Sequence, residues 1–136
     1  MFSSLDVSTS GLVAQRTRLN AISSNIANMS TTRNEEGKPE PYQARFVTFQ
    51  TDNDLSTPGG GAGVKVGGVE QSGAPPKLKY EPGHPDADER GFVRYPAVDM
   101  TTEFVDALEA TRAYEANVGV IEITKNMADQ ALRIIA

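Results

Sequence analysis

The chain is poor in the residues that carry most protein chemistry: it has no Cys, no Trp and a single His among 136 residues. The lack of Cys excludes a disulfide framework, a thiol nucleophile and a Cys-based metal site. The net charge is −5 and Lys and Arg form no cluster, which disfavours nucleic acid and anionic membrane surfaces as partners. No apolar run approaches the length of a membrane span, and the first basic residue is Arg16. We therefore expect neither membrane insertion nor a cleavable signal peptide.

The composition also limits the size of the hydrophobic core. Hydrophobic residues make up 38% of the chain, and most of its 12 Gly and 8 Pro lie in the middle of the sequence. A chain of this length and composition can bury only a small core. Apolar surface that this core leaves over requires a partner outside the chain.

The last third of the sequence, residues 98–136, predicts one long helix. Less polar residues recur there at alternating steps of three and four, the spacing of a stripe that packs against another helix: Phe104, Ala107, Thr111, Tyr114, Val118 and Ile121. Lys125 interrupts this repeat. The stripe resumes through Thr124 and Ala128, which predicts a stutter after Ile121.

The segment from about Ser4 to Met29 predicts a second helix, with an N-terminal capping pattern at Ser3 to Asp6. Its stripe continues without a slip: Leu5, Ser8, Leu12, Gln15, Leu19, Ile22, Ile26 and Met29. The two stripes predict helix pairing, either within the chain as a helical hairpin or with partners outside it.

Polar residues accompany both stripes. Gln15 lies inside the first stripe, and the amides Asn25, Asn28 and Asn117 lie beside the apolar positions. Polar residues at such positions fix register and partner choice in coiled coils. Asn28 is equally explained as a helix C-cap, and the sequence leaves both interpretations open.

The middle of the chain predicts a small β-rich segment. Residues 42–50 alternate as a strand does, 52–63 form a flexible Gly-rich tether, and 64–69 and 77–81 are two further short strands. Gly67 and Gly68 mark a bend or a bulge. These strands predict a small antiparallel platform packed on the helices. The expected fold is α+β with three parts: residues 1–32, 33–97 and 98–136.

The turn EPGHPDADER at residues 81–90 holds the only His together with several carboxylates. A hydrolase in which His84 acts with Asp86 or Asp88, or a metal site, is the chemical alternative here. His84 has no second His or Cys to join it, and the spacing of the two Asp residues lacks the Gly and distal Glu of a calcium loop. We therefore predict an ordered, solvent-facing turn, and no catalytic, cofactor-binding or metal-binding residues.

Four stretches of the chain carry a resemblance to a known family. They are LNAISSNIAN at 19–28, PYQARFVTFQ at 41–50, YEPGHPDADERGFVRYP at 80–96 and VDALEATRAYEANV at 105–118. In this order, and through nearly the whole chain, they resemble the flagellar axial proteins of rod and hook. Ala97 departs from the pattern, since Asn is usual after the Tyr-Pro, and the Gly-rich run holds more Gly than the family pattern does.

The resemblance implies a structural, non-enzymatic subunit without cofactors. Its terminal helices would pair as a coiled-coil assembly domain and polymerise into the tubular proximal rod, which transmits torque and conducts exported subunits, with the β segment outside. The implied partners are other copies of the chain, other rod proteins and the flagellar type III export apparatus, and the implied location is the periplasmic rod. The alternative function is a coiled-coil adaptor that binds a partner through the acidic PGHPDAD turn.

Both the stripes and the resemblance predict a subunit interface along the helices. Its expected residues are Leu12, Gln15, Leu19, Ile22, Asn25, Ile26, Asn28, Phe104, Tyr114, Asn117, Val118 and Ile121.

Overall fold

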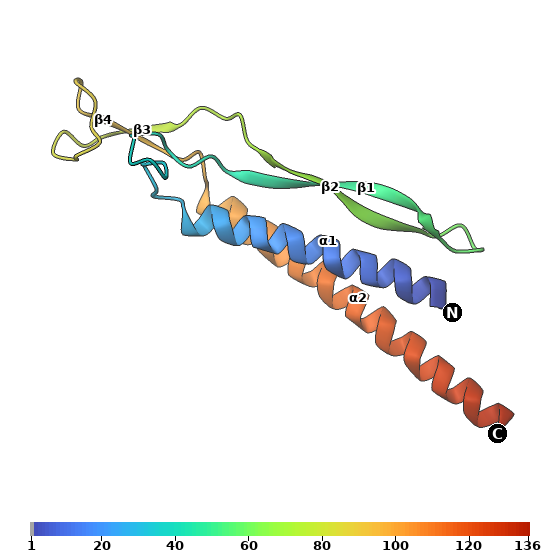
Figure 1. Cartoon of the computed structure of the whole chain (residues 1–136). Helices are drawn as coiled ribbons and strands as arrows, with labels where there is room; N and C mark the ends of the chain where they lie inside the picture. Colours follow the sequence, from blue (N-terminus) through green and yellow to red (C-terminus); the bar gives the residue numbers. More distant parts are fainter. Residues whose placement is uncertain (1) are drawn as a thin grey trace.

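The computed structural model describes residues 2–136. Its elements, in chain order, are α1 (Phe2–Ala27), β1 (Arg45–Ser56), β2 (Ala62–Gln71), β3 (Lys77–Tyr80), β4 (Phe92–Tyr95) and α2 (Met100–Ile135). Two long helices at the ends of the chain lie against each other, with antiparallel strands between them in sequence (Figure 1). This arrangement confirms the predicted α+β class with paired terminal helices. Within the described residues, no helix is both long and apolar enough to cross a membrane.

The helix ends follow local capping chemistry. At the start of α2, the Asp99 carboxylate accepts hydrogen bonds from the backbone N–H and the hydroxyl of Thr102, at 3.2 and 2.8 Å. At the end of α1, the Asn28 amide donates to the Ser24 carbonyl at 2.9 Å. This contact supports the C-cap interpretation of Asn28. The predicted cap at Ser3 is wrong, because α1 already begins at Phe2.

The helices run antiparallel, and their register is set by contacts along their length. Arg18 on α1 forms ion pairs with Glu109 at 3.2 Å and Asp106 at 3.6 Å on α2. Gly11 lies against Asn117, so closely that a Cβ atom at residue 11 would be 2.9 Å from the Asn117 Oδ1. Gly inside a helix costs about 1 kcal/mol relative to Ala. The close approach of Asn117 explains why the chain has Gly at this point.

The stripe of α2 that turns toward α1 differs from the predicted one. Ala110 is fully buried, whereas Thr111 is exposed and Phe104 is 57% exposed. Glu103 and Asn117 contact Asn25 and Gly11 of α1. Buried or half-buried residues in step with these two form what we call the inner stripe: Glu103, Ala107, Ala110, Tyr114, Asn117, Ile121 and Thr124. Its steps of four and three continue through Ile121, so the predicted stutter is wrong for this stripe. Small or polar side chains take the places given to Thr111 and Val118, which lets the helices approach closely.

The strands form two separate hairpins rather than one platform. β1 and β2 pair from Arg45 opposite Gln71 to Ser56 opposite Ala62. The predicted tether at 52–63 is therefore wrong: it consists of paired strand and of a turn in which Thr57 and Gly61 exchange backbone and side-chain hydrogen bonds. Thr48 and Phe49 pair with Gly68 and Val66, which leaves Gly67 as the extra residue of the predicted bulge.

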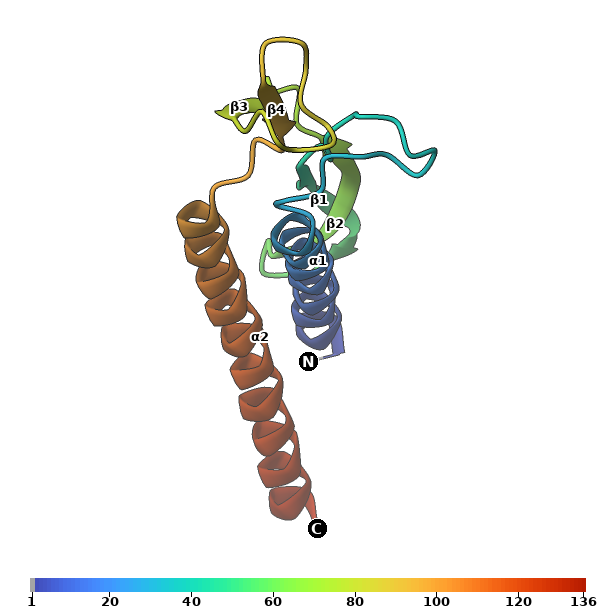
Figure 2. The same ribbon diagram turned by 90° about the vertical axis from the view of Figure 1, so that its left-hand side faces the viewer.

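The second hairpin joins β3 to β4, and the sequence had revealed only the first of these strands. Lys77 pairs with Tyr95 and Tyr80 with Phe92, and residues 81–91 connect them. This hairpin lies beyond the C-terminal end of α1, away from the helix pair (Figure 1). The β1–β2 hairpin instead follows α1, which lies between that hairpin and α2 (Figure 2).

The core is as small as the composition indicated. Its buried hydrophobic residues are Ala14, Ala21, Ile22, Val93, Val98 and Ala110. Three of them are alanines, and most large apolar side chains of α2 stay partly or fully exposed. The helix pair therefore buries little hydrophobic surface of its own.

α2 extends well past α1 at its C-terminal end (Figure 1). In the register that places Gly11 against Asn117, the first turn of α1 lies opposite the turn of α2 that contains Thr124. The overhang, residues 127–135, has no partner helix among the described residues. Met127 is 59%, Leu132 66% and Ile134 86% exposed.

We expect backbone amides of the overhang to exchange with solvent faster than those of residues 107–121 in the purified subunit. An unpacked helix segment opens more easily than one held against a neighbour. Hydrogen exchange read out by mass spectrometry measures both segments in one experiment. Equal protection of the two segments would contradict this expectation.

Candidate assembly interface

Asn25 is the most completely bonded side chain of the helix pair. It is 3% exposed, and its amide bonds reciprocally to the backbone of Arg45, the first residue of β1. The Asn25 Nδ2 donates to the Arg45 carbonyl at 2.8 Å, and the Arg45 N–H donates to the Asn25 Oδ1 at 2.7 Å. The side chain thus forms the same paired bonds that a neighbouring strand would form, and it holds β1 against α1.

The Asn25 side chain also forms hydrogen bonds with two further parts of the chain. Its Nδ2 donates to the Glu103 carboxylate at 3.2 Å, and its Oδ1 accepts from the Tyr42 hydroxyl at 3.0 Å. Burial raises the pKa of Glu103, the Asn25 bond opposes this shift, and Asp106 and Asp99 add to it. Burial is also the main cause of the raised pKa of Tyr42. One amide therefore joins α1, α2, β1 and the preceding loop.

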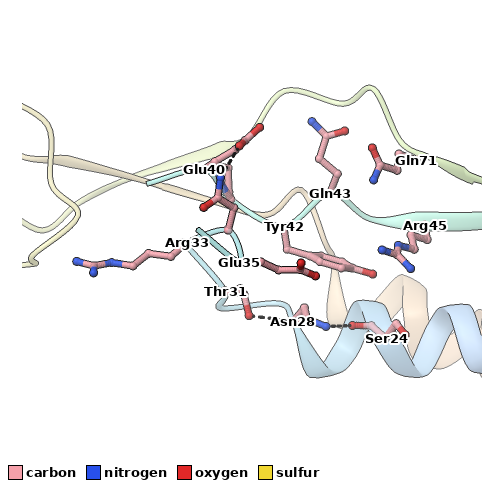
Figure 3. A pocket seen from close by; sticks show the side chains of 12 residues that line it. Ser24, Asn28, Thr31, Arg33, Glu35, Glu40, Tyr42, Gln43, Arg45 and Gln71 are labelled. Atoms are coloured by element: carbon pink, nitrogen blue, oxygen red, sulfur yellow. Dashed lines mark hydrogen bonds between the residues drawn. The ribbon is translucent and has the colours of Figure 1, made fainter. Parts of the chain in front are cut away.

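A polar pocket of about 460 Å³ lies beside this junction, at the end of α1. Figure 3 shows the Tyr42 side chain extending over Asn28 and Ser24, with Arg45 nearby. Glu35 and Glu40 line the same pocket, so its charges have both signs. Such a lining does not define a site for either an anion or a cation.

The turn of residues 81–91 is tied to the segment that follows α1. The Asp86 side chain is 7% exposed, and it accepts hydrogen bonds from the Thr32 hydroxyl at 2.7 Å and the Arg33 guanidinium at 2.6 Å. The Thr32 bond is the largest cause of a lowered pKa of Asp86. Burial opposes it, and Arg33 lowers the pKa further. The prediction of a solvent-facing turn is therefore wrong for Asp86, which is already engaged within the chain.

His84 is also engaged locally. Its Nδ1 accepts the backbone N–H of Asp86 at 3.0 Å, and its ring lies edge-on to Tyr95 with centroids 6.3 Å apart. Asp88 accepts the backbone N–H groups of Arg90 and Phe92, both at 2.9 Å. Over residues 2–136, no group of three or more His, Cys, Asp or Glu side chains is placed to hold a metal ion. These contacts give the polar residues of the turn structural roles.

The twelve predicted interface residues have three kinds of environment. Ile22 and Asn25 are buried within the chain, and Phe104 is exposed. The others are half-buried: Leu12, Gln15, Leu19, Ile26, Asn28, Tyr114, Asn117, Val118 and Ile121. The Oε1 of Gln15 is a buried side-chain oxygen for which the described residues supply no hydrogen-bond partner.

Helix geometry places four of these residues on one side of the helix pair. Two positions along a helix correspond to about 200°, so Leu12 and Leu19 point away from Ala14 and Ala21, which line grooves against the β1–β2 hairpin. In an antiparallel pair, residues that come one position after an inner residue lie on the same side in both helices. Val118 follows the inner residue Asn117, as Leu12 follows Gly11.

Phe104 follows the inner residue Glu103 in the same way, and Leu19 follows Arg18. We call this set, Leu12, Leu19, Phe104 and Val118, the outer face. The hairpin packs on another side of α1, where Ala14 and Ala21 lie. Of the outer face, Phe104 is exposed, and Leu12, Leu19 and Val118 are half-buried.

Several residues that hold the two helices and β1 together were not predicted from the sequence. Gly11, Arg18 and Glu103 set the helix register, yet a search for apolar stripes passes over all three. A Gly inside a long helical pattern is the one signal that pointed to a close helix approach. Tyr42 and Arg45 fall in the predicted strand. Neither the bond from the Tyr42 hydroxyl to Asn25 nor the bonds between the Arg45 backbone and Asn25 have a signature in the sequence.

Comparison with known proteins shows the class to which this helix pair belongs. Residues 5–33 match the family model described as "Flagella basal body rod protein". Residues 89–134 match the model described as "Flagellar basal body rod FlgEFG protein C-terminal". The two models thus cover α1 and α2, and they place the chain among the flagellar basal-body rod proteins.

Relatives of nearly the same length refine this class. A protein of Borreliella burgdorferi named "Flagellar basal-body rod protein FlgC" is 41% identical over 99% of this chain and 97% of its own length. Proteins of the same name are 42% identical in Salmonella typhimurium, over 95% of this chain and 93% of that protein, and 41% identical in Bacillus subtilis, over 98% and 97%. The chain belongs to the FlgC family of flagellar basal-body rod proteins. It is a structural subunit of that rod, as the resemblance implied.

Replacement of Asn25 by Ala should lower the free energy of unfolding by about 1–3 kcal/mol, because it leaves the backbone groups of Arg45 without partners. Asn20→Ala is the matched control, since Asn20 is an exposed Asn of the same helix. Urea denaturation of the two variants and the parent chain measures the difference. A loss from Asn25→Ala no larger than the control's, within about 0.5 kcal/mol, would contradict this role.

The Asp86 contacts should make stability depend on pH in acid. Because the pKa of Asp86 is lowered in the folded chain, its contribution is fully present above the usual carboxyl pKa of about 4. It is lost as the pH falls through the lower folded-state value. Asp86→Asn should destabilise the chain at neutral pH, and the difference from the parent should shrink in acid. Denaturation at a series of pH values tests this, with the exposed Glu89→Gln as control. A difference that does not vary with pH would refute the assignment.

Proposed function

We propose that the chain polymerises through the outer face of its helix pair, together with other copies of itself and other rod proteins, into the tubular proximal rod. Residues 1–32 and 98–136 form the assembly domain, and residues 33–97 lie outside it. The assembled rod transmits torque and conducts exported subunits. No enzymatic step is part of this function.

The observation that carries the proposal is the distribution of apolar side chains on the helix pair. The inner stripe is made largely of small or polar residues, whereas Phe104 of the outer face is 57% exposed, and its neighbours Val105 and Leu108 on α2 are 60 and 53% exposed. Fully burying a large apolar side chain gains about 1.5–3 kcal/mol. A neighbouring subunit that covers these residues therefore adds stability that the chain lacks alone.

We further propose that the chain reaches the periplasm through the flagellar type III export apparatus. The small core and the exposed helix faces support this route, since a weakly packed chain unfolds at low cost for transport. Partner copies then supply the burial that the free subunit does not have.

Replacement of Phe104 by Ala should impair rod formation while leaving the subunit folded. Phe104 is 57% exposed, so the stability of the free chain should change by no more than about 0.5 kcal/mol. In the rod, each copy would lose the burial of one aromatic side chain. Counting basal bodies and measuring swimming in a strain whose only copy carries the substitution tests the expectation.

Glu122→Gln is the control, because it changes an exposed polar residue of the same helix. Cell fractionation shows whether each variant is exported equally well. Normal rods and normal swimming with Phe104→Ala, at parental levels of exported protein, would contradict an assembly role for the outer face.

A further inference from the structure

A second apolar stripe on α2, separate from both the inner stripe and the outer face, begins at Val120 and runs into the overhang. Val120, Ile123, Met127 and Ile134 are 46, 61, 59 and 86% exposed. Their steps of three, four and seven bring them onto one side of the helix, at the spacing of anchors that insert into a groove. We call these four residues the overhang stripe. The nearby charged residues Lys125, Asp129 and Arg133 fall on other sides of α2.

A matching groove lies between α1 and the β1–β2 hairpin. It has a volume of about 410 Å³ and an aliphatic lining that includes Val13, Ala14, Leu55, Val64 and Val66. Val13 is 58% exposed although it lies on a helix with packed neighbours on two sides. Nothing within the described residues fills this groove.

The overhang of the same chain cannot reach its own groove. The register of the helix pair places Val13 opposite the turn of α2 that precedes Asn117. Met127 then lies about 12 residues, or ~18 Å, further along the axis. Val13, two positions after Gly11, also faces the side of α1 away from α2. An occupant with the chemistry of the overhang stripe must therefore come from another molecule.

We propose that the overhang of one copy docks into the α1–hairpin groove of the next copy of this chain. This inference deepens the proposed function and rests on it, because it names a second contact between copies in the same rod. The helix supplies Met127 and Ile134 as aliphatic anchors, and the groove supplies aliphatic walls. The charged residues that line the groove, Asp6 and Lys65, are exposed.

Charges at the rim favour the same pairing. Asp6 and Lys65 flank the groove, and Arg133 precedes Ile134 on the docking helix. An Arg133–Asp6 contact joins opposite charges. Lys65 is suited to the negative end of the α2 dipole. Since stripe and groove are different surfaces, each copy offers one of each, and such a contact builds an open stack instead of a closed dimer.

The lack of Cys in the chain makes this contact directly testable by disulfide cross-linking. The double variant Val13→Cys/Met127→Cys, as the only copy in a flagellated strain, should yield a ladder of dimers, trimers and larger species after mild oxidation of isolated basal bodies. Each single variant should yield no ladder. Both positions are more than half exposed, so the substitutions leave the fold intact.

A second pair and a matched control make the result specific. Asp6→Cys/Arg133→Cys probes the rim and should also give a ladder. Ser23→Cys/Met127→Cys places one cysteine on an exposed position of α1 outside the groove and should not. Ladders from the first two pairs, and none from the third, support the docking of copy on copy.

The remaining outcomes overturn the inference in distinguishable ways. Normal rods in which neither groove pair cross-links would refute the docking while leaving the proposed function intact. A single adduct with a different rod protein would show that the occupant is not a second copy. If the parent chain as sole copy builds no rods, the proposed function fails, and the inference that rests on it fails too.

Discussion

The reciprocal hydrogen bonds between the Asn25 side chain and the Arg45 backbone are the constraint on which the arrangement of the chain depends. They fix the start of β1 to the last turns of α1, so the long hairpin that follows must run back along that helix. The same amide binds Glu103 in the first turn of α2. With one side of α1 held against the hairpin and another against α2, the surfaces left for other molecules include the outer face, the overhang and the groove between α1 and the hairpin. The proposed site of assembly is therefore the surface that these internal contacts leave uncovered.

The helix pair divides its side chains by size. Gly11, Ala110 and Asn117 lie where the two helices approach, whereas Phe104 and Val118 lie outside. Small inner residues allow close approach but contribute little hydrophobic burial, which scales with apolar area. The pair is thus held in register by polar and ionic contacts such as Arg18 with Glu109. Most of its apolar surface is available to stabilise contacts between molecules.

The sequence predicted those features of the fold that depend on the local spacing of residue types. Both helices, the strand at Arg45, the bulge at Gly67 and the class of fold follow from spacing and from glycine chemistry. In part of α2, the predicted stripe differs from the inner stripe by one residue. A search for apolar residues selects Phe104 and Val118, whereas the polar residues Glu103 and Asn117 contact α1. The strand from Asp52 to Ser56 was missed because its side chains are mostly polar, and it is held by ladder hydrogen bonds to β2, which do not depend on side-chain type. Asn25 was singled out correctly as an amide that needs a partner, but a backbone partner on another element has no signature in sequence.

Among the hydrogen bonds that attach the part between the helices to α1 and to the segment after it, two attachments lie far apart, and their separation has a mechanical consequence. Asn25 holds β1, and Asp86 holds the β3–β4 turn to Thr32 and Arg33, just after the helix ends. A single attachment would let the β segment rotate about it, whereas two attachments to different hairpins resist rotation relative to the helix axis. If the rod transmits torque as proposed, a subunit must pass twist between its helices and its outer part without yielding. The only His and the carboxylates of the turn, which from the sequence resemble the parts of a catalytic site, are then explained by the need to keep this second attachment rigid.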